Sequence, residues 1–158
     1  MAFFQANASH LVGGYITYEC LGNNQYEIKM RVYRDSVNGN PPYDAIAEVW
    51  VFDGTGVLNQ TLNIPKGPTN LVPFDTSDCT SIPPNIYIQV VDYIDTVTLP
   101  PAAGGYTLTY QSCCRNKIID NVTNPTSLGS TYTTNIPAND TSCNSSPAFM
   151  DNPPIVLC

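Results

Sequence analysis

Apolar and polar residues alternate along most of this chain, so the dominant repeat is two residues rather than one helical turn. The clearest run covers residues 25–34. Its apolar members are Tyr26, Ile28, Met30 and Val32. The polar residues that alternate with them are Gln25, Glu27, Lys29 and Arg31. This alternation is typical of a strand that is buried on one face and wet on the other. The pattern therefore predicts an antiparallel sheet.

Further segments of the same character predict the rest of the sheet. We expect strands at residues 15–18, 46–52, 57–64, 86–94, 96–99 and 106–112, with weaker candidates at 130–136 and 154–157. Gly, Asn and Asp residues at 22–24 and 53–56 favour tight turns. These turns predict that the first two pairs of strands form hairpins.

Prolines separate these runs and disfavour helices. There are fourteen, with pairs at 41–42, 83–84, 100–101 and 153–154, and a proline inside a helix removes a hydrogen bond and clashes with the preceding turn. Only residues 117–122 suggest one short helical turn. Many short strands between Gly, Pro and Asn turns predict an all-β antiparallel β-sandwich, Ig-like or jelly-roll-like, with almost no helix. We expect residues 9–158 to form a single domain.

Composition excludes several classes of partner. The 158 residues are 42% hydrophobic but only 12% charged, and the net charge is −7. A negative chain is repelled by nucleic acid and by anionic membrane surfaces. No segment approaches the roughly 20 apolar residues that a membrane-spanning helix needs. We therefore expect no nucleic-acid partner and no membrane insertion.

Six cysteines predict a disulfide-stapled fold outside the reducing cytosol. They are Cys20, Cys79, Cys113, Cys114, Cys143 and Cys158. Because a bond between adjacent residues would strain the peptide between them, we expect Cys113 and Cys114 to reach two different partners. Their position at a strand end suggests that one of them pairs with Cys158 and ties down the C-terminal strand.

The N-terminal residues indicate export. Residues 3–9 look like the end of a secretory signal, with Ala6 and Ala8 as the small residues before cleavage at Ser9. We therefore expect an extracellular or cell-surface protein exported by a cleaved signal peptide. Residues 1–8 are then either a remnant of that signal or an N-terminal extension. Phe3 and Phe4 make the second alternative a candidate assembly segment that docks on a neighbouring copy.

Candidate chemistry is sparse. A serine or cysteine nucleophile needs a base, and the chain has one histidine, His10, next to the predicted cleavage site. The cysteines show no C-x-x-C spacing of a zinc site, and the acidic residues form no recognisable calcium loop. We assign no catalytic residue, no metal ligand and no cofactor, and we expect a protein that is not an enzyme.

Several motifs, in order along the chain, resemble a known family. They lie at residues 9–18, 24–26, 32–35, 96–100, 105–106, 110–116, 144–147 and 153–158. Together they resemble the N-terminal module of large secreted surface proteins of Bacteroidota, of the gliding-motility-associated and type IX-secreted adhesin-like kind. The resemblance implies a cell-surface structural or adhesive role. The family continues into further repeats and a sorting domain beyond such a module.

Two positions depart from the family pattern. Where the family often has cysteines, this chain has Ser36 and Tyr87, and losing both together is what the loss of one disulfide would produce. The segments around Ser36 and Thr96 also resemble the Asp-Ser/Thr-apolar motif of O-glycosylation in this phylum. Ser36 and Thr96 are therefore candidate glycan attachment sites.

Three functions remain, in order of preference. The first is a non-enzymatic extracellular structural or adhesive module that self-assembles into a filament or binds other surface-protein domains. The second is a carbohydrate-binding module of a larger adhesin, with Trp50 and the ten tyrosines as candidate glycan platforms. The third is a secreted hydrolase, which would require a cleft with convergent carboxylates.

Overall fold

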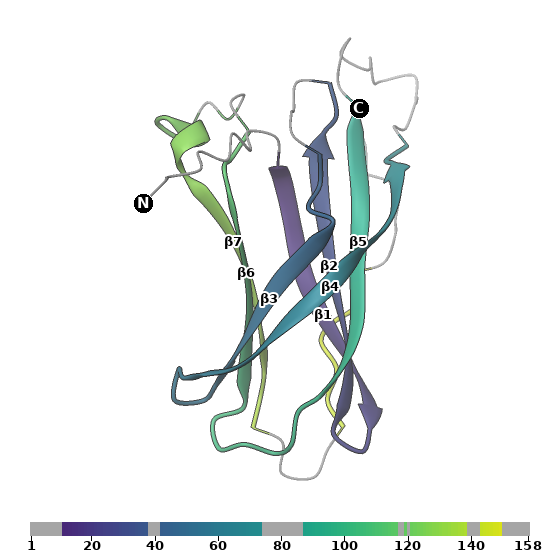
Figure 1. Cartoon of the computed structure of the whole chain (residues 1–158), viewed down its shortest axis with the longest axis vertical. Coiled ribbons are helices and arrows are strands. Elements are labelled where there is room, and N and C mark those ends of the chain that lie inside the picture. Colours follow the sequence, from purple (N-terminus) through teal and green to yellow (C-terminus); the bar gives the residue numbers. More distant parts are fainter. Residues whose placement is uncertain are drawn as a thin grey trace, which may run out of the picture.

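A computed structural model gives the arrangement of residues 11–37, 42–73, 87–116, 119, 121–138 and 143–149. These residues form seven antiparallel strands and one short 3₁₀ turn (Figure 1). The strands are β1 (Leu11–Gly22), β2 (Gln25–Asp35), β3 (Ile46–Asp53), β4 (Leu58–Leu71), β5 (Ile88–Thr98), β6 (Tyr106–Cys113) and β7 (Gly129–Ile136). The turn η1 covers Pro125–Ser127, between β6 and β7. The predicted all-β antiparallel class is confirmed.

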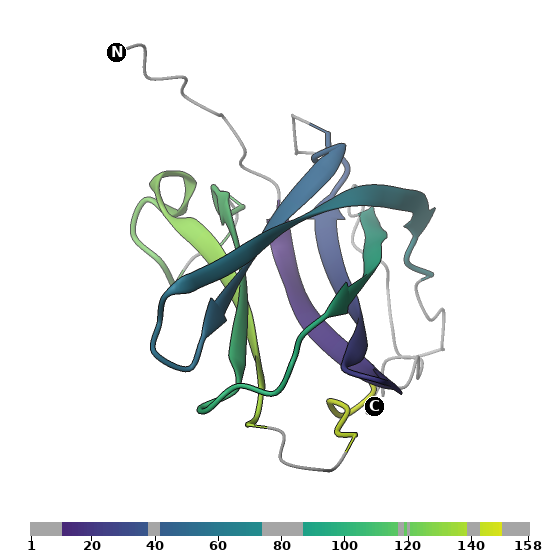
Figure 2. The ribbon, with the colours of Figure 1, turned by 60° about the horizontal axis from the view of Figure 1, so that its bottom comes forward.

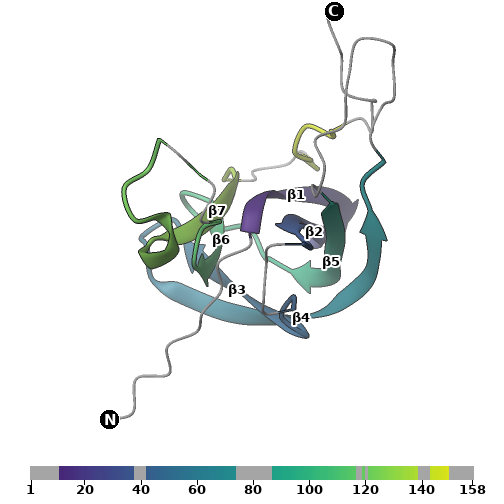
Figure 3. The same cartoon turned by 90° about the horizontal axis from the view of Figure 1, so that it is seen from above.

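All seven strands belong to one sheet, in the order β1-β2-β5-β4-β3-β6-β7. The first part of β4 pairs with β3 and its last part pairs with β5. The sheet therefore folds over along β4 into two layers. We call β1, β2 and β5 the first layer, and β3, β6 and β7 the second layer. Seen from above, the strands close into a ring that brings β1 round to β7 (Figure 3).

This connectivity is that of an immunoglobulin constant-type sandwich. In that topology strands 1, 2, 5 and 4 form one sheet and strands 3, 6 and 7 the other. A second feature of such domains is present at the start of β6, where the Tyr106 hydroxyl donates to the carbonyl oxygen of Pro100 at 2.8 Å. Of the two predicted sandwich types, the Ig-like one is therefore the observed one.

The alternation of β2 produces the burial that the sequence predicts. The side chains of Tyr26, Ile28, Met30 and Val32 are at most 2% exposed. They face the space between the layers, where they meet apolar side chains of β3, β5 and β6. Burying such side chains contributes about 1.5–3 kcal/mol each relative to leaving them in water. The interior between the layers is thus the core of the fold.

Tyrosine hydroxyls link the core to the segment before β3. The hydroxyl of Tyr93 donates to the Asp44 carbonyl oxygen at 2.7 Å, and that of Tyr110 donates to Asp44 Oδ2 at 2.9 Å. The Tyr43 hydroxyl donates to the Gln89 carbonyl oxygen at 2.7 Å. Burial raises the pKa of all three tyrosines well above its usual value. These side chains therefore remain neutral donors that join the two layers.

Some strand boundaries differ from those that the sequence predicts. The sequence predicts two strands at residues 86–94 and 96–99, but β5 is continuous because Asp95 projects its side chain into solvent without interrupting the ladder to β2. β4 continues past Pro65 to Leu71, beyond the predicted end at residue 64. A register shift between Lys66 and Thr69 accommodates this segment, since a bulge tolerates residues that a regular ladder does not.

Candidate functional site

Residues 143–149 cover part of the free edge of β1. A disulfide joins Cys20 to Cys143. The backbone N–H of Cys20 donates to Ser145 Oγ at 3.0 Å, and that of Tyr18 donates to Ser146 Oγ at 3.0 Å. The Ser146 N–H donates to the Tyr18 carbonyl oxygen at 2.9 Å. This yellow segment lies at the end of β1 in Figure 2.

A groove of about 470 Å³ lies between this segment and the outer face of β1 and β2. The residues that line it are Tyr15, Thr17, Tyr18, Glu19, Glu27, Lys29, Arg31, Ser145, Ser146, Ala148 and Phe149. Its volume falls within the range of small-ligand sites. Charged, hydroxyl and aromatic groups therefore meet in one concave place on the first layer.

The two basic residues of the groove are held by one carboxylate. Arg31 donates from Nε to Asp92 Oδ1 at 2.6 Å and from Nη2 to Oδ2 at 2.8 Å, a bidentate pair. Lys29 Nζ lies 3.3 Å from the same Oδ2. Hydrogen bonds from Arg31 are the main reason that the pKa of Asp92 lies below its usual value, although partial burial opposes them. This carboxylate stays ionised at neutral pH and offsets much of the positive charge.

Two aromatic rings form the apolar part of the groove. The rings of Tyr15 and Phe149 lie 4.4 Å apart between centroids, and those of Tyr15 and Tyr33 lie 6.5 Å apart. Burial raises the pKa of the Tyr15 hydroxyl, and the charge of Arg31 partly opposes that rise. Phe149 remains 66% exposed. An exposed phenyl ring held against a tyrosine offers an apolar contact surface to a ligand.

Two glutamates face each other across the β1–β2 ladder. Glu19 and Glu27 are directly opposite partners, an arrangement in which like charges repel. Neither has a salt bridge or a side-chain hydrogen bond within the described part of the chain. Glu19 is exposed and Glu27 half-buried. The groove can therefore accept hydrogen bonds through these two carboxylates.

The other edge of the sheet differs from that of β1. β7 pairs with β6, and no other strand among the described residues pairs with it. Its sequence, Gly-Ser-Thr-Tyr-Thr-Thr-Asn-Ile, has no charge and no proline. β1 lies beside β7 without a ladder, and a Cβ on Gly14 would lie 3.0 Å from the Tyr132 ring. Side-chain packing and one isolated parallel bridge, between Leu11 and Arg115, close this side of the sandwich.

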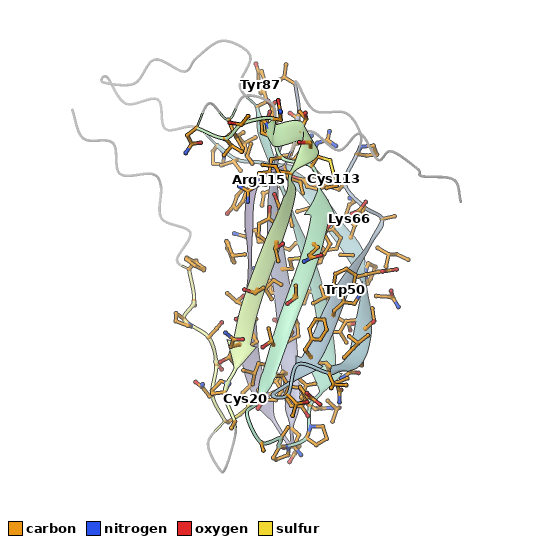
Figure 4. All side chains as sticks on the ribbon, turned by 90° about the vertical axis from the view of Figure 1, so that its left-hand side faces the viewer. Cys20, Trp50, Lys66, Tyr87, Cys113 and Arg115 are labelled. Carbon is orange, nitrogen blue, oxygen red and sulfur yellow. A yellow bond between two sulfur atoms is a disulfide. The ribbon has the colours of Figure 1, made fainter. Side chains whose placement is uncertain are left out.

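The cysteine doublet corrects one prediction. Cys113 and Cys114 are bonded to each other, across a cis peptide, so the expectation that they reach two partners, one of them Cys158, was wrong. β6 ends at Cys113, where it still pairs with Gly129. The described cysteines outside the doublet, Cys20 and Cys143, are already joined, and Cys20 lies at the opposite end of the molecule (Figure 4). Among the described cysteines, the two members of the doublet are therefore each other's partner.

The two positions that depart from the family pattern are neighbours. The backbone N–H and the hydroxyl of Ser36 both donate to the Tyr87 carbonyl oxygen at 2.9 Å. This adjacency agrees with the expectation that one lost disulfide would explain both departures. Of the candidate glycan sites, Thr96 is exposed on β5, whereas Ser36 is half-buried and its hydroxyl is already a donor.

Several sequence predictions lie outside the described residues. They concern the signal remnant at residues 1–8 with Phe3 and Phe4, and also His10, Cys79, Cys158 and the candidate strand at 154–157. Within the described ranges, no group of three or more His, Cys, Asp or Glu residues could hold a metal ion. In the same part of the chain, no helix is long and apolar enough to cross a membrane.

Sequence reasoning missed the groove. Alternation along β1 and β2 does place Tyr15, Glu19, Glu27 and Arg31 on an outward face, but it gives no information about what covers them. The missing wall comes from residues 143–149, whose position depends on contacts with residues more than 120 positions earlier. The paired Cys20 and Cys143 were the one available signal, and six cysteines allow fifteen pairings.

No family model, curated protein or solved structure matches this chain.

Proposed function

We propose that this chain is a non-enzymatic extracellular structural and adhesive module of a bacterial cell surface, and that it self-associates into a filament. The observation that carries the proposal is the difference between the two sheet edges. The edge of β1 is hydrogen-bonded to residues 145–146, whereas the edge of β7 has no strand partner among the described residues besides β6. An unpaired, uncharged edge is a template for strand addition.

Soluble proteins usually protect such an edge. Lysine, proline and bulges are the common devices, and β7 has neither a charged residue nor a proline nor a register shift against β6. The alternating threonines of β7 also favour an extended conformation in a partner-bound state. A second copy that supplies one extended segment would satisfy the outward N–H and C=O groups of β7.

The N-terminal residues are the proposed source of that segment. Phe3 and Phe4 precede β1, and an apolar extended segment gains both ladder hydrogen bonds and apolar burial when it adds to a sheet edge. The family resemblance supports the same function, because it implies a surface module, and the disulfides favour an oxidising compartment. Glycans on Thr96 and Ser36 would suit that compartment.

Electron microscopy combined with light scattering tests assembly. We expect regular fibres from the native material, and a loss of assembly when residues 1–8 are deleted or when Phe3 and Phe4 are both replaced by alanine. Gln5→Ala is the matched control and should assemble normally. Fibres that persist after the deletion would exclude this segment, and a strictly monomeric native protein would overturn the assembly proposal.

Hydrogen exchange tests the edge itself without a mutation. Amides of β7 that point away from β6 should exchange quickly in the monomer and slowly in the fibre. Amides near Tyr18 should be protected in both states, because Ser145 and Ser146 already bond there. Equal exchange of β7 amides in monomer and fibre would place the contact elsewhere.

The hydrolase alternative has a direct test in the groove. Glu19 and Glu27 are the two carboxylates that could act, and Glu19 lacks the desolvated environment that enzymes use to make a carboxyl group a general acid. We expect no release of reducing ends from any polysaccharide. Release that disappears in both Glu19→Gln and Glu27→Gln would make the protein an enzyme.

The carbohydrate-binding alternative is favoured by the composition of the outer face of the second layer, which lies on the opposite side of the sandwich from the groove.

A further inference from the structure

The outer face of the second layer is a continuous hydrogen-bonding surface. We call it the threonine face. Eleven outward residues of β4, β3, β6 and β7 are polar or aromatic, and they are Thr61, Asn63, Glu48, Trp50, Phe52, Thr107, Thr109, Gln111, Thr131, Thr133 and Asn135. The margin of the face along β3 and β4 also has two exposed apolar side chains, Ile46 and Leu58. Figure 4 looks onto this side of the molecule, with β7, β6 and β3 toward the viewer. Five of these eleven residues are threonines, so hydroxyl groups dominate the face.

Trp50 lies in the middle of this face. In the ladders it stands directly opposite Thr61 of β4 and Thr109 of β6, and Thr109 stands opposite Thr133 of β7. One row thus places an indole among three threonines on four adjacent strands. Thr109 is only 9% exposed although it projects outward. Trp50 is the largest side chain directly opposite Thr109 in these ladders.

The next row continues the same chemistry. Phe52 of β3 stands opposite Thr107, and Thr107 stands opposite Asn135. The Thr107 hydroxyl donates to Asn135 Oδ1 at 2.8 Å, which leaves the Asn135 amide N–H₂ and one further acceptor position of each group for a ligand. Phe52 and Trp50 are both half-buried, so parts of two neighbouring rings contact solvent among the hydroxyls.

Charge is almost absent from this face. Glu48, at its margin on β3, is the one ionisable side chain among the eleven residues, and the whole chain carries a net charge of −7. An acidic polymer would be repelled, and a basic one would find one carboxylate. The face therefore suits a neutral ligand that forms many hydrogen bonds.

We propose that the threonine face binds a neutral polysaccharide, with one sugar ring stacked on Trp50. A sugar ring has C–H groups on its two faces and hydroxyls on its rim. The indole contacts the C–H groups, and threonine hydroxyls, which both donate and accept, pair with the rim. A polysaccharide is extended, so it can follow one row of opposed outward residues across the four strands.

A protein partner fits this face less well. Cores of protein interfaces are enriched in Tyr, Trp, Phe, Met and Arg, and the face has two half-buried aromatic rings in a field of threonine, asparagine and glutamine. A second copy of this chain would also bring a face of the same composition, with no complementary cation for Glu48. The proposal goes beyond assembly, and neither proposal depends on the other.

The single tryptophan of the chain makes the test direct, because all tryptophan emission comes from Trp50. The probes are soluble xylan, mixed-linkage β-glucan, galactan and mannan, with alginate as an acidic polymer. We expect at least one neutral polymer to shift the emission and to protect it from acrylamide quenching. Alginate should do neither.

Variants then assign the site. In affinity electrophoresis, Trp50→Ala should weaken retention by the active polymer about tenfold or more, the effect expected of a stacked aromatic contact. Thr133→Ala should weaken it less, and its urea unfolding curve checks that the fold is kept. Tyr15→Ala and Phe149→Ala test the groove as the competing site, and Tyr87→Ala, which is 54% exposed and belongs to neither surface, is the matched aromatic control that should bind normally.

Each outcome decides the matter. Retention by a neutral polymer that is lost in Trp50→Ala and kept in the groove variants supports the proposal. No retention and no emission change with any polymer overturns it, as does retention lost only in the groove variants. If the emission of Trp50 shifts with protein concentration when no polymer is present, the threonine face is assigned to self-association instead. A protein that binds polysaccharide but stays monomeric supports this inference and overturns the filament proposal.

Discussion

The two layers of the sandwich present different surfaces, although their strands show the same alternation. The outward residues of the first layer include Glu19, Glu27, Lys29, Arg31 and Asp92, whereas those of the second layer include one ionisable side chain, Glu48. The edge of the first layer is covered by residues 145–146 and by a long-range disulfide. At the edge of the second layer, β7 has no hydrogen-bonded partner strand among the described residues besides β6, although β1 lies beside it.

The outer surface of the first layer is therefore stabilised by contacts within the chain, whereas that of the second layer is available to a partner. On the first layer, charge pairing and edge coverage satisfy backbone and side-chain groups within the chain. On the second layer, comparable groups are left to water or to a partner. Because the outward residues of the two layers lie on opposite sides of the core, substitutions on the outer face of the second layer should leave the charge pairs of the first layer unchanged.

The largest expected effect concerns the two disulfides. Cys20–Cys143 closes a separation of 123 residues, whereas Cys113–Cys114 joins neighbours. In the chain-entropy account the first bond lowers the entropy of the unfolded chain by the equivalent of about 5 kcal/mol and the second by about 1 kcal/mol. Replacing Cys20 and Cys143 by alanine should therefore cost several times more unfolding free energy, in urea titrations, than replacing Cys113 and Cys114. Equal losses would contradict this account.

A smaller effect is expected where the two layers meet. In Gly14→Ala the new Cβ would lie 2.7 Å from the Arg31 carbonyl oxygen and 3.0 Å from the Tyr132 ring. Overpacking of this kind costs about 1–3 kcal/mol. Gly13→Ala is the matched control, because a Cβ on Gly13 would meet no other atom within 4 Å. If both variants unfold at the same urea concentration, β1 and β7 are not in contact in solution.

The smallest effect is a pH dependence that belongs to the first layer. The folded pKa of Asp92 lies below its usual value of 3.8, chiefly because of Arg31. Its contribution to stability is therefore complete above the unfolded pKa and is lost as pH falls through the folded pKa. Asp92→Asn should lower the unfolding free energy by about 1 kcal/mol at neutral pH and by less below pH 3.8.

Asp53, in the turn between β3 and β4, provides the comparison from the other layer. Hydrogen bonds from Thr55 are the main reason that its pKa is also lowered. Asp53→Asn should likewise remove the part of the wild-type acid dependence that this carboxylate supplies, measured by urea titration between pH 2 and 6. If the unfolding free energy of Asp92→Asn varies with pH as strongly as that of the wild type, the pair between Asp92 and Arg31 does not contribute to the acid dependence.

The sequence was sufficient for what depends on neighbouring residues. Alternation located β2, β3 and β6 because a strand buries every second residue whatever it packs against, and Gly and Asn residues located the hairpin turns. Here local chemistry and the final structure agree.

What depends on distant contacts could not be read in the same way. The position of residues 143–149 against β1 follows from pairings far apart in the chain, and alternation carries no information about them. The cysteine doublet was interpreted from the strain of a bond between neighbours, without knowledge of where other cysteines lie. The threonine face needed the register of four strands before Trp50 and Thr109 could be placed side by side.

The Cys20–Cys143 bond also has a mechanical consequence. When the chain is pulled from both sides of this module, tension passes along β1 to Cys20, across the disulfide, and out through Cys143. The chain between these two cysteines, which are 123 positions apart, carries none of the load, and about 400 Å of extended backbone stays folded away. Under such a pull, covalent bonds rather than the hydrogen bonds of the sheet would set the resistance of one module to lengthening.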